Sequence, residues 1–162
     1  MVILKKQAAG VTALALSRFV ARACRAAKVD GKVNVLVTTN REMQALNSRF
    51  RDKNMATDVL SFPAAQNPMS ETLGDIAISA EMAAHNAKLL GHSRAEEIKI
   101  LALHGVLHLA GFDHERDNGK MAREEARLRN VLGLPAGLIE RTRAPGNTAK
   151  KPSAINRFRK LR

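Results

Sequence analysis

Two segments of the chain alternate between hydrophobic and polar residues with the two-residue period of a strand. Residues 33–39 (VNVLVTT) and 73–79 (LGDIAIS) combine this alternation with β-branched side chains, so both are predicted to be strands. The hydrophobic run that ends at Pro63 predicts a third strand, because proline has no N–H to continue a ladder. Residues 2–6 fit a short edge strand. The pattern therefore predicts a sheet of about four strands.

Helical periodicity accounts for most of the remaining chain. Residues 11–27 place apolar side chains at near-helical spacing among basic ones. Caps and terminal glycines give the bounds of the other helices. These are 41–50 behind a Thr39–Glu42 capping box, 80–90 between Ser79 and Gly91, a helix from the Ser93–Glu96 capping box to Ala110, and a last helix from an Asp117 cap to Leu132, closed by Gly133 and Pro135. We predict an α+β fold, a single domain with a small mixed β-sheet of about four strands packed against about five helices.

The segment from Ile98 to Ala110 is apolar on nearly every side, which is typical of a buried central helix. The main polar interruptions are Lys99, His104 and His108. The two histidines are four residues apart, so on a helix they stand one turn above each other, roughly 6 Å apart along the axis. Both imidazoles can coordinate one metal ion, and a buried helix fixes the geometry of these ligands.

Three of the five histidines lie within the stretch HGVLHLAGFDH, residues 104–114. Gly111 can take the positive φ that ends a helix and can turn the chain so that His114 returns towards the first two. Three imidazoles at about 2.0–2.1 Å leave a fourth tetrahedral position for water, the pattern of a catalytic zinc site. Ordinary packing is the alternative for these histidines, whereas His85 and His92 are interpreted as ordinary polar helix or loop positions. For this trio, packing alone is a poor explanation, and we predict one Zn²⁺ with three histidine ligands plus water.

The same spacing matches the HExxHxxGxxH motif of the metzincin peptidases in its histidines and glycine. Position 105 is glycine, where those enzymes have the glutamate that acts as general base, so Gly105 disfavours a zinc peptidase. The stretch resembles instead the motif HGxLHLxGxDH of the YbeY family, bacterial rRNA maturation factors usually described as metal-dependent endoribonucleases. Every fixed position of that motif is present.

Two further blocks extend the resemblance over most of residues 33–132. LNSRFRDKNMATDVLSFP (46–63) is similar to the family's LNxxYRxKDxPTDVLSFP, and LGDIAIS matches its LGDIxIS. Phe50 replaces the usual tyrosine and loses only a hydroxyl, whereas Ala56 replaces a proline in the loop that carries Lys53.

The resemblance implies a function, a location and a set of partners. The function would be that of a single-strand-preferring, zinc-dependent endoribonuclease in rRNA maturation, including 16S rRNA 3′ end processing, and in ribosome biogenesis. The location would be the cytoplasm. The partners would be rRNA or the small ribosomal subunit, with a small-subunit ribosomal protein and an assembly GTPase as further candidates.

The family also places a functionally important arginine after the aromatic residue of the second block, which is Arg51 here. A guanidinium can hold two phosphate oxygens bidentately, although an ordinary surface arginine is the alternative. The resemblance favours Arg51 and His114 as catalytic residues, with Lys53 and Arg49 as substrate contacts. Asp113, beside a ligand, either orients an imidazole or caps the turn.

No residue stands out as the general base. The metal would either lower the pKa of its water or polarise a phosphoryl oxygen, and the substrate 2′-hydroxyl is an alternative nucleophile. The chain has no Tyr or Trp, and of its five Phe only Phe50 and Phe62 lie near Arg51, so RNA recognition is expected to rest on phosphates and shape. A non-cleaving ribosome assembly factor with a structural zinc is the main alternative function.

Net charge is +12, and most of it lies at one end of the chain. After Glu140 the sequence has eight basic residues and no acidic one, so two thirds of the excess falls in residues 141–162. We predict a catalytic domain over residues 1–140 and a basic, disordered tail over 141–162. The tail either adds salt-sensitive attraction to nucleic-acid phosphates or only improves solubility.

The remaining composition gives no argument for export. A single cysteine, Cys24, excludes an internal disulfide and a cysteine metal site. No apolar run approaches the length needed to span a bilayer, so no membrane partner is expected. The first 29 residues are basic and lack acids, which suits an organelle transit peptide, but the amphipathic pattern favours an integral first helix. The oligomeric state stays open.

Overall fold

The structure is a computed structural model that describes residues 1–65 and 71–136. Its elements in chain order are β1 (Val2–Leu4), α1 (Ala13–Ala26), β2 (Lys32–Thr38), α2 (Asn40–Arg51), β3 (Val59–Pro63), β4 (Thr72–Ser79), α3 (Ala80–Leu90), α4 (Arg94–Leu109) and α5 (Lys120–Leu132). The predicted α+β class, the four-stranded sheet and the five helices are confirmed. The predicted tail, 141–162, and the boundary at residue 140 lie outside the described residues.

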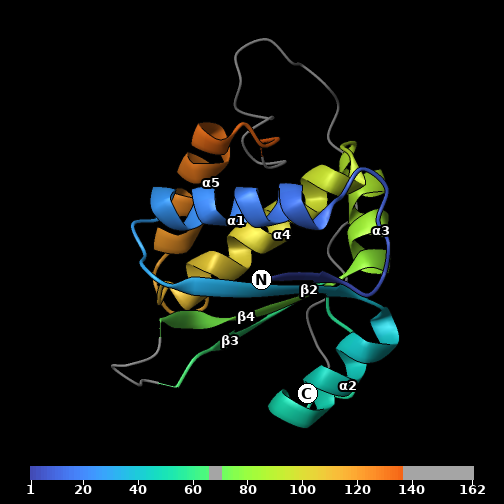
Figure 1. Cartoon of the computed structure of the whole chain (residues 1–162). Helices are drawn as coiled ribbons and strands as arrows, with labels where there is room; N and C mark the ends of the chain where they lie inside the picture. Colours follow the sequence, from blue (N-terminus) through green and yellow to red (C-terminus); the bar gives the residue numbers. More distant parts are fainter. Residues whose placement is uncertain (66–70, 137–162) are drawn as a thin grey trace, which may run out of the picture.

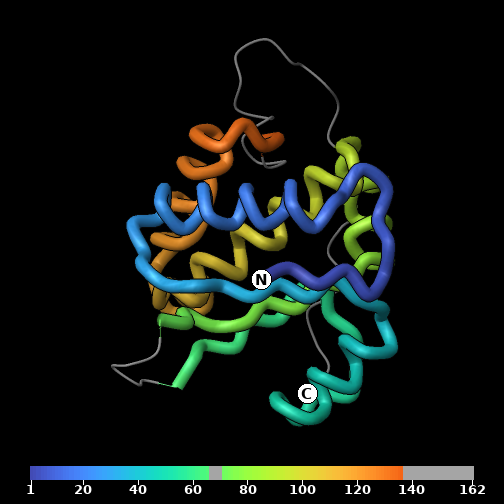
Figure 2. The backbone as a smooth tube through the Cα atoms, viewed as in Figure 1, coloured from blue at the N-terminus to red at the C-terminus, as the bar shows by residue number. Residues whose placement is uncertain are grey.

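The sheet is mixed, with strand order β1-β2-β4-β3. The pairs β1–β2 and β2–β4 are parallel, whereas β3 runs antiparallel to β4 and lies at the edge of the sheet. Helices α1, α4 and α5 lie on one side of the sheet and α2 lies on the other (Figure 1). The backbone trace follows the same two sides, with α3 at one end of the sheet (Figure 2).

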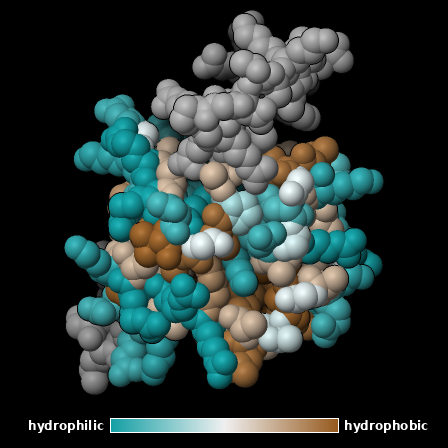
Figure 3. All heavy atoms as spheres, turned by 90° about the horizontal axis from the view of Figure 1, so that it is seen from above, coloured by the Kyte–Doolittle hydropathy of each residue, from teal (hydrophilic) through white to brown (hydrophobic). Residues whose placement is uncertain are grey.

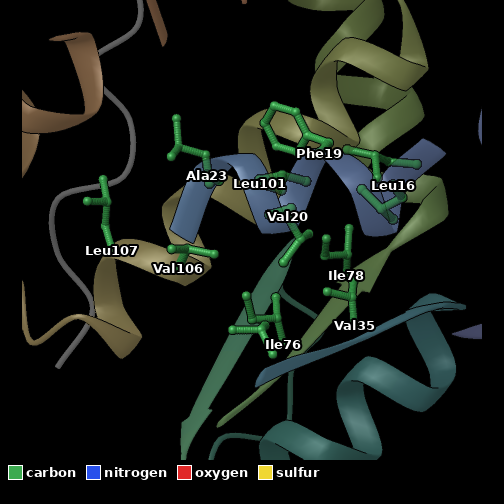
Figure 4. Close-up of a cluster of buried hydrophobic side chains, with 14 of the residues drawn as sticks. Leu16, Phe19, Val20, Ala23, Val35, Ile76, Ile78, Leu101, Val106 and Leu107 are labelled. Carbon is green, nitrogen blue, oxygen red and sulfur yellow. The ribbon is translucent and has the colours of Figure 1, made fainter. Parts of the chain in front are cut away.

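Helix α4 is buried, as its all-round apolar sequence predicts. Ten of its 16 residues are buried, and its side chains Leu101, Val106 and Leu107 belong to the main core. Around them lie residues of α1, β2 and β4, which Figure 4 labels: Leu16, Phe19, Val20, Ala23, Val35, Ile76 and Ile78. The helix that carries two of the candidate ligands is therefore held on both sides by close packing.

Most of the predicted helix ends are confirmed. Ser79 caps α3, the Ser93–Glu96 capping box opens α4, and Gly91 ends α3 at a φ of 74°. The Thr39–Glu42 box is only half formed. The Thr39 hydroxyl accepts the Glu42 N–H, but the Glu42 carboxylate accepts hydrogen bonds from Thr38 and Lys5 instead. Helix α5 begins three residues after Asp117, whose carboxylate still accepts the N–H of Met121.

The sequence suggested that His92 is an ordinary polar loop position, and the structure shows that it is not. Its side chain is 6% exposed and its Nε2 lies 2.5 Å from Oε2 of Glu97, which is 4% exposed. This buried pair ties the α3–α4 loop to the first turns of α4 and contributes to the fixed position of that helix. His85, by contrast, is exposed on α3, as expected.

The surface on the side of α1, α4 and α5 is mostly hydrophilic where it is coloured, with smaller hydrophobic areas between (Figure 3). Among the described residues, no helix combines the length and the hydropathy that crossing a bilayer requires.

Candidate metal centre

His104 and His108 lie on α4 with their Nε2 atoms only 3.1 Å apart. Each ring is held from its other side. Nδ1 of His108 lies 3.0 Å from the carbonyl oxygen of Phe112, and Nδ1 of His104 lies 2.9 Å from Oε2 of Glu125. A carbonyl or a carboxylate can only accept, so both Nδ1 atoms carry the proton and donate it. Each Nε2 is then left with a free lone pair.

Two lone pairs that face each other at 3.1 Å repel, unless a cation lies against both. The donor set therefore fits a metal ion, and the anchoring of each imidazole by a second partner is typical of histidine ligands in proteins. The carbonyl of Phe112 is available as that partner because α4 ends at Leu109 with Ala110 as its cap, and Gly111 follows with a φ of 90°, which turns the chain back over His108.

His114 completes the cluster from the loop after α4. The candidate ligand atoms of His104, His108 and His114 all lie within 4.8 Å of one another. The ring centroids of His104 and His108 lie 5.6 and 5.1 Å from that of His114. His114 is exposed, whereas the other two are half-buried. The three residues can hold one metal ion on the solvent side of α4.

Asp113 orders the turn that presents His114. Its carboxylate accepts the N–H of Glu115, and its carbonyl accepts the N–H groups of Arg116 and Asp117. Of the two roles considered for Asp113, the structure supports the capping of the turn. The carboxylate that orients an imidazole belongs instead to Glu125 of α5, a residue that the sequence analysis did not identify.

Two pKa shifts suit the metal-binding state. Burial lowers the pKa of His108, and the nearby His104 and His114 lower it further, so His108 stays neutral and able to bind a cation. Burial alone would raise the pKa of Glu125, but the hydrogen bond from His104 and the ion pair with Arg129 outweigh burial and hold that pKa below its usual value. Glu125 is therefore an ionised acceptor for His104.

Gly105 lies on the face of α4 that packs on the sheet. A Cβ atom at this position would lie 2.8 Å from Cδ1 of Ile76 on β4, too close for a normal contact. A glutamate at position 105 would therefore be forced into the packed core. The local fold gives an independent argument against a peptidase whose general base stands after the first histidine.

Arg51, the last residue of α2, is exposed and lies by the edge strand β3. Its guanidinium donates a hydrogen bond to the carbonyl oxygen of Ser61 at 3.3 Å. The Ser61 hydroxyl in turn donates to the carbonyl oxygen of Gly105, at 3.4 Å. Two hydrogen bonds thus connect Arg51 to the α4 backbone between His104 and His108.

Arg51 and the histidines do not line the same pocket. The carbonyl oxygen of Asp58 accepts the N–H of Ser79 at the end of β4, and the Asn86 amide donates to the Asp58 carboxylate. Both residues and Val59 line the small cavity beside His104. Backbone carbonyls along an antiparallel edge strand point alternately towards and away from the partner strand. The carbonyls of Val59 and Ser61, two residues apart, therefore both point away from β4. Val59, beside His104, and Ser61, which Arg51 contacts, are therefore neighbours on one strand, roughly 7 Å apart along it.

The other two candidate substrate contacts also lie at the end of α2. The guanidinium carbon of Arg49 stands over the ring of Phe50, 5.4 Å from its centroid. Lys53 is exposed in the loop that follows. That loop is held to α2 because the Asn47 side chain donates to the carbonyl of Met55 at 2.8 Å.

Glu125 provides a first prediction. Replacing it with glutamine keeps a group that can accept from His104 but removes the charge, so the affinity for Zn²⁺ is expected to fall by about tenfold or more. Competition with a chromophoric chelator measures this affinity. Glu124→Gln is the matched control, because Glu124 pairs with Arg127 rather than with a ligand. Equal affinities for the two variants would contradict the role assigned to Glu125.

Fold and site together define a class of α+β protein in which a buried helix and the following turn supply three histidines that could hold a metal ion, without the glutamate of the metzincin peptidases. Within that class, the chain belongs to the YbeY family: the family described as Endoribonuclease YbeY matches residues 4–133. The resemblance noted from the sequence motifs is thereby confirmed.

Similar proteins support the same assignment. Endoribonuclease YbeY of Koribacter versatilis is 56% identical over 151 residues, covering 93% of this chain and 97% of the relative. Endoribonuclease YbeY of Solibacter usitatus is 47% identical over 130 residues, 80% and 86% of the two chains. The solution structure of TM1509 from Thermotoga maritima is 24% identical, with a TM-score of 0.54, and covers 93% of this chain and all of its own. That likeness concerns the fold.

Proposed function

We propose that this protein is a metal-dependent endoribonuclease that prefers single-stranded RNA and acts in the maturation of rRNA, including the 3′ end of 16S rRNA. One observation carries the proposal for this chain: the free Nε2 atoms of His104 and His108 face each other while their Nδ1 atoms are anchored. Membership of the YbeY family supports the choice of RNA as substrate. Zn²⁺ is the proposed ion, because three imidazole donors suit it well.

The chain's own residues have distinct tasks. His104, His108 and His114 would hold the ion, which when bound supplies Lewis-acid chemistry at a phosphate. Arg51 would hold phosphate oxygens through its planar guanidinium and neutralise the charge that builds up on them. Lys53, exposed on the adjacent loop, would add attraction for the neighbouring phosphates.

The exposure of His114 favours a catalytic role for the ion over a purely structural one. Structural sites are usually closed by four protein ligands, whereas the cluster found among the described residues has three and opens to solvent at His114. A non-cleaving assembly factor is the second candidate function. In either case we propose a cytoplasmic protein that contacts the small ribosomal subunit, with a small-subunit ribosomal protein and an assembly GTPase as partners.

The proposed function is tested by the ion dependence of cleavage. Purified protein, stripped of metal and reloaded with one equivalent of Zn²⁺, is expected to cut an unpaired RNA and to cut the same strand more slowly in a duplex. Analysis of the new ends identifies the nucleophile, because attack by the 2′-hydroxyl leaves a 2′,3′-cyclic phosphate and hydrolysis does not. Stripped and reloaded samples that leave RNA equally intact would contradict the proposal.

A further inference from the structure

An open groove of about 710 Å³ lies on the side of the sheet against which α2 packs. Its apolar wall comes from α2 and from the sheet residues that α2 leaves uncovered. The side chains that matter here are Leu36, Leu46, Phe50, Arg51, Phe62 and Ala77. None of the metal-binding residues lines it, so the groove is a separate feature from the metal centre among the described residues.

Two of the chain's few aromatic rings meet at the rim of this groove. Phe50 and Phe62 pack edge to face, with centroids 5.2 Å apart, and Phe50 is 57% exposed. The guanidinium of Arg49 lies over the Phe50 ring. Arg49, Phe50 and Phe62 are called the aromatic rim below. A large exposed aromatic next to a stacked guanidinium is the kind of surface on which unpaired bases stack.

The groove also has polar side chains that could pair with the polar edge of a base. On its sheet side, the amide of Asn34 donates to the carboxylate of Asp75 at 2.8 Å, and both residues line the groove. Arg51 stands beside the aromatic rim. An apolar peptide segment would cover these groups without pairing their remaining donors and acceptors, whereas a nucleotide offers a flat ring, polar edges and a phosphate together.

We propose that this groove binds an unpaired base of the RNA substrate, stacked on the aromatic rim, while Arg51 holds the adjoining phosphate. The inference rests on the proposed function and adds a physical cause for its preference for single strands. A base inside a duplex is already stacked and paired, so it cannot enter the groove without an unstacking cost. The proposed base site also adds stacking to the phosphate and shape contacts on which RNA recognition was expected to rest.

The test uses a short RNA with a single 2-aminopurine, whose fluorescence is quenched when it stacks. The chain has no Trp or Tyr, so the protein contributes little background. Fluorescence is read within seconds of mixing the zinc-loaded full chain with RNA, before cleavage proceeds. Wild type is expected to quench the probe. Phe50→Ala is expected to bind about tenfold more weakly and to quench less.

Matched variants separate stacking from a general effect. Phe50→Tyr keeps the ring and is expected to restore binding and quenching. Leu89→Ala removes an apolar side chain that is even more exposed, 70% on α3 and outside the groove, and is expected to behave as wild type. RNA with an abasic position in place of the probe is expected to bind wild type and Phe50→Ala equally.

The outcomes distinguish this inference from the proposed function. If wild type cleaves RNA but Phe50→Ala binds RNA as tightly as wild type, the base site is overturned and the proposed function stands. Quenching that depends on Phe50 without any cleavage would support the base site and remove the nuclease. If sedimentation shows a wild-type dimer that Phe50→Ala converts to a monomer, the groove is an interface between two copies and the inference is overturned.

Discussion

His108→Ala is expected to abolish zinc-dependent RNA cleavage and to weaken zinc binding by at least about a hundredfold. The binding free energy of a structural zinc site, about 10–16 kcal/mol, is shared by about four ligands, so each contributes roughly 3 kcal/mol. His108 is the central ligand of the cluster, since its Nε2 faces that of His104 and its ring lies 5.1 Å from that of His114. Chelator competition and cleavage of unpaired RNA are the measurements.

The matched control for this variant is His85→Ala, because His85 is exposed on α3 and takes no part in the cluster. It is expected to keep both zinc and activity. Thermal unfolding gives an independent readout: zinc in excess should raise the melting temperature of wild type and of His85→Ala, but not of His108→Ala. One tightly bound equivalent of zinc in His108→Ala would show that the ion lies elsewhere.

The clustering of His104, His108 and His114 could be predicted from the sequence because its geometry is local. His104 and His108 are related by one helical turn, and the glycine that returns His114 follows within three residues. The caps of α3 and α4 were predictable for the same reason. Burial of α4 followed from an apolar pattern that leaves no polar stripe.

The anchor of His104 could not be predicted in this way. Glu124 and Glu125 are adjacent on α5, and the sequence gives no reason to prefer one. Packing of α5 beside α4 points Glu125 at His104, whereas Glu124 pairs with Arg127. The groove is a similar case, because the contact of Phe50 with Phe62 depends on where α2 crosses β3.

The position of Gly105 shows how one residue can serve both fold and chemistry. From the sequence, the glycine only marks the absence of a peptidase base. In the structure its missing side chain lets α4 approach Ile76 and lets its carbonyl accept from Ser61. The same contact brings β3, and with it Arg51, close to the helix that carries the ligands.

Arg51→Ala is expected to reduce the rate of RNA cleavage by about 10²–10³-fold, the usual effect of removing one donor that stabilises transition-state charge. Zinc content is expected to stay at one equivalent, because Arg51 contacts the carbonyl of Ser61 and no ligand. The melting temperature should change by no more than about 2 °C, since Arg51 is exposed. Cleavage kinetics, metal analysis and thermal unfolding are measured on the same preparation.

Two further variants show whether the guanidinium itself is needed. Arg51→Lys keeps the charge but loses the planar pair of donors, so it should recover only part of the rate. Arg41→Ala removes an exposed arginine from the other end of α2 and should cleave as wild type does. Cleavage that survives unchanged in Arg51→Ala would remove Arg51 from the catalytic site. Cleavage that is lost while zinc and stability are retained would exclude a non-cleaving assembly factor, because a contaminating nuclease would not respond to Arg51.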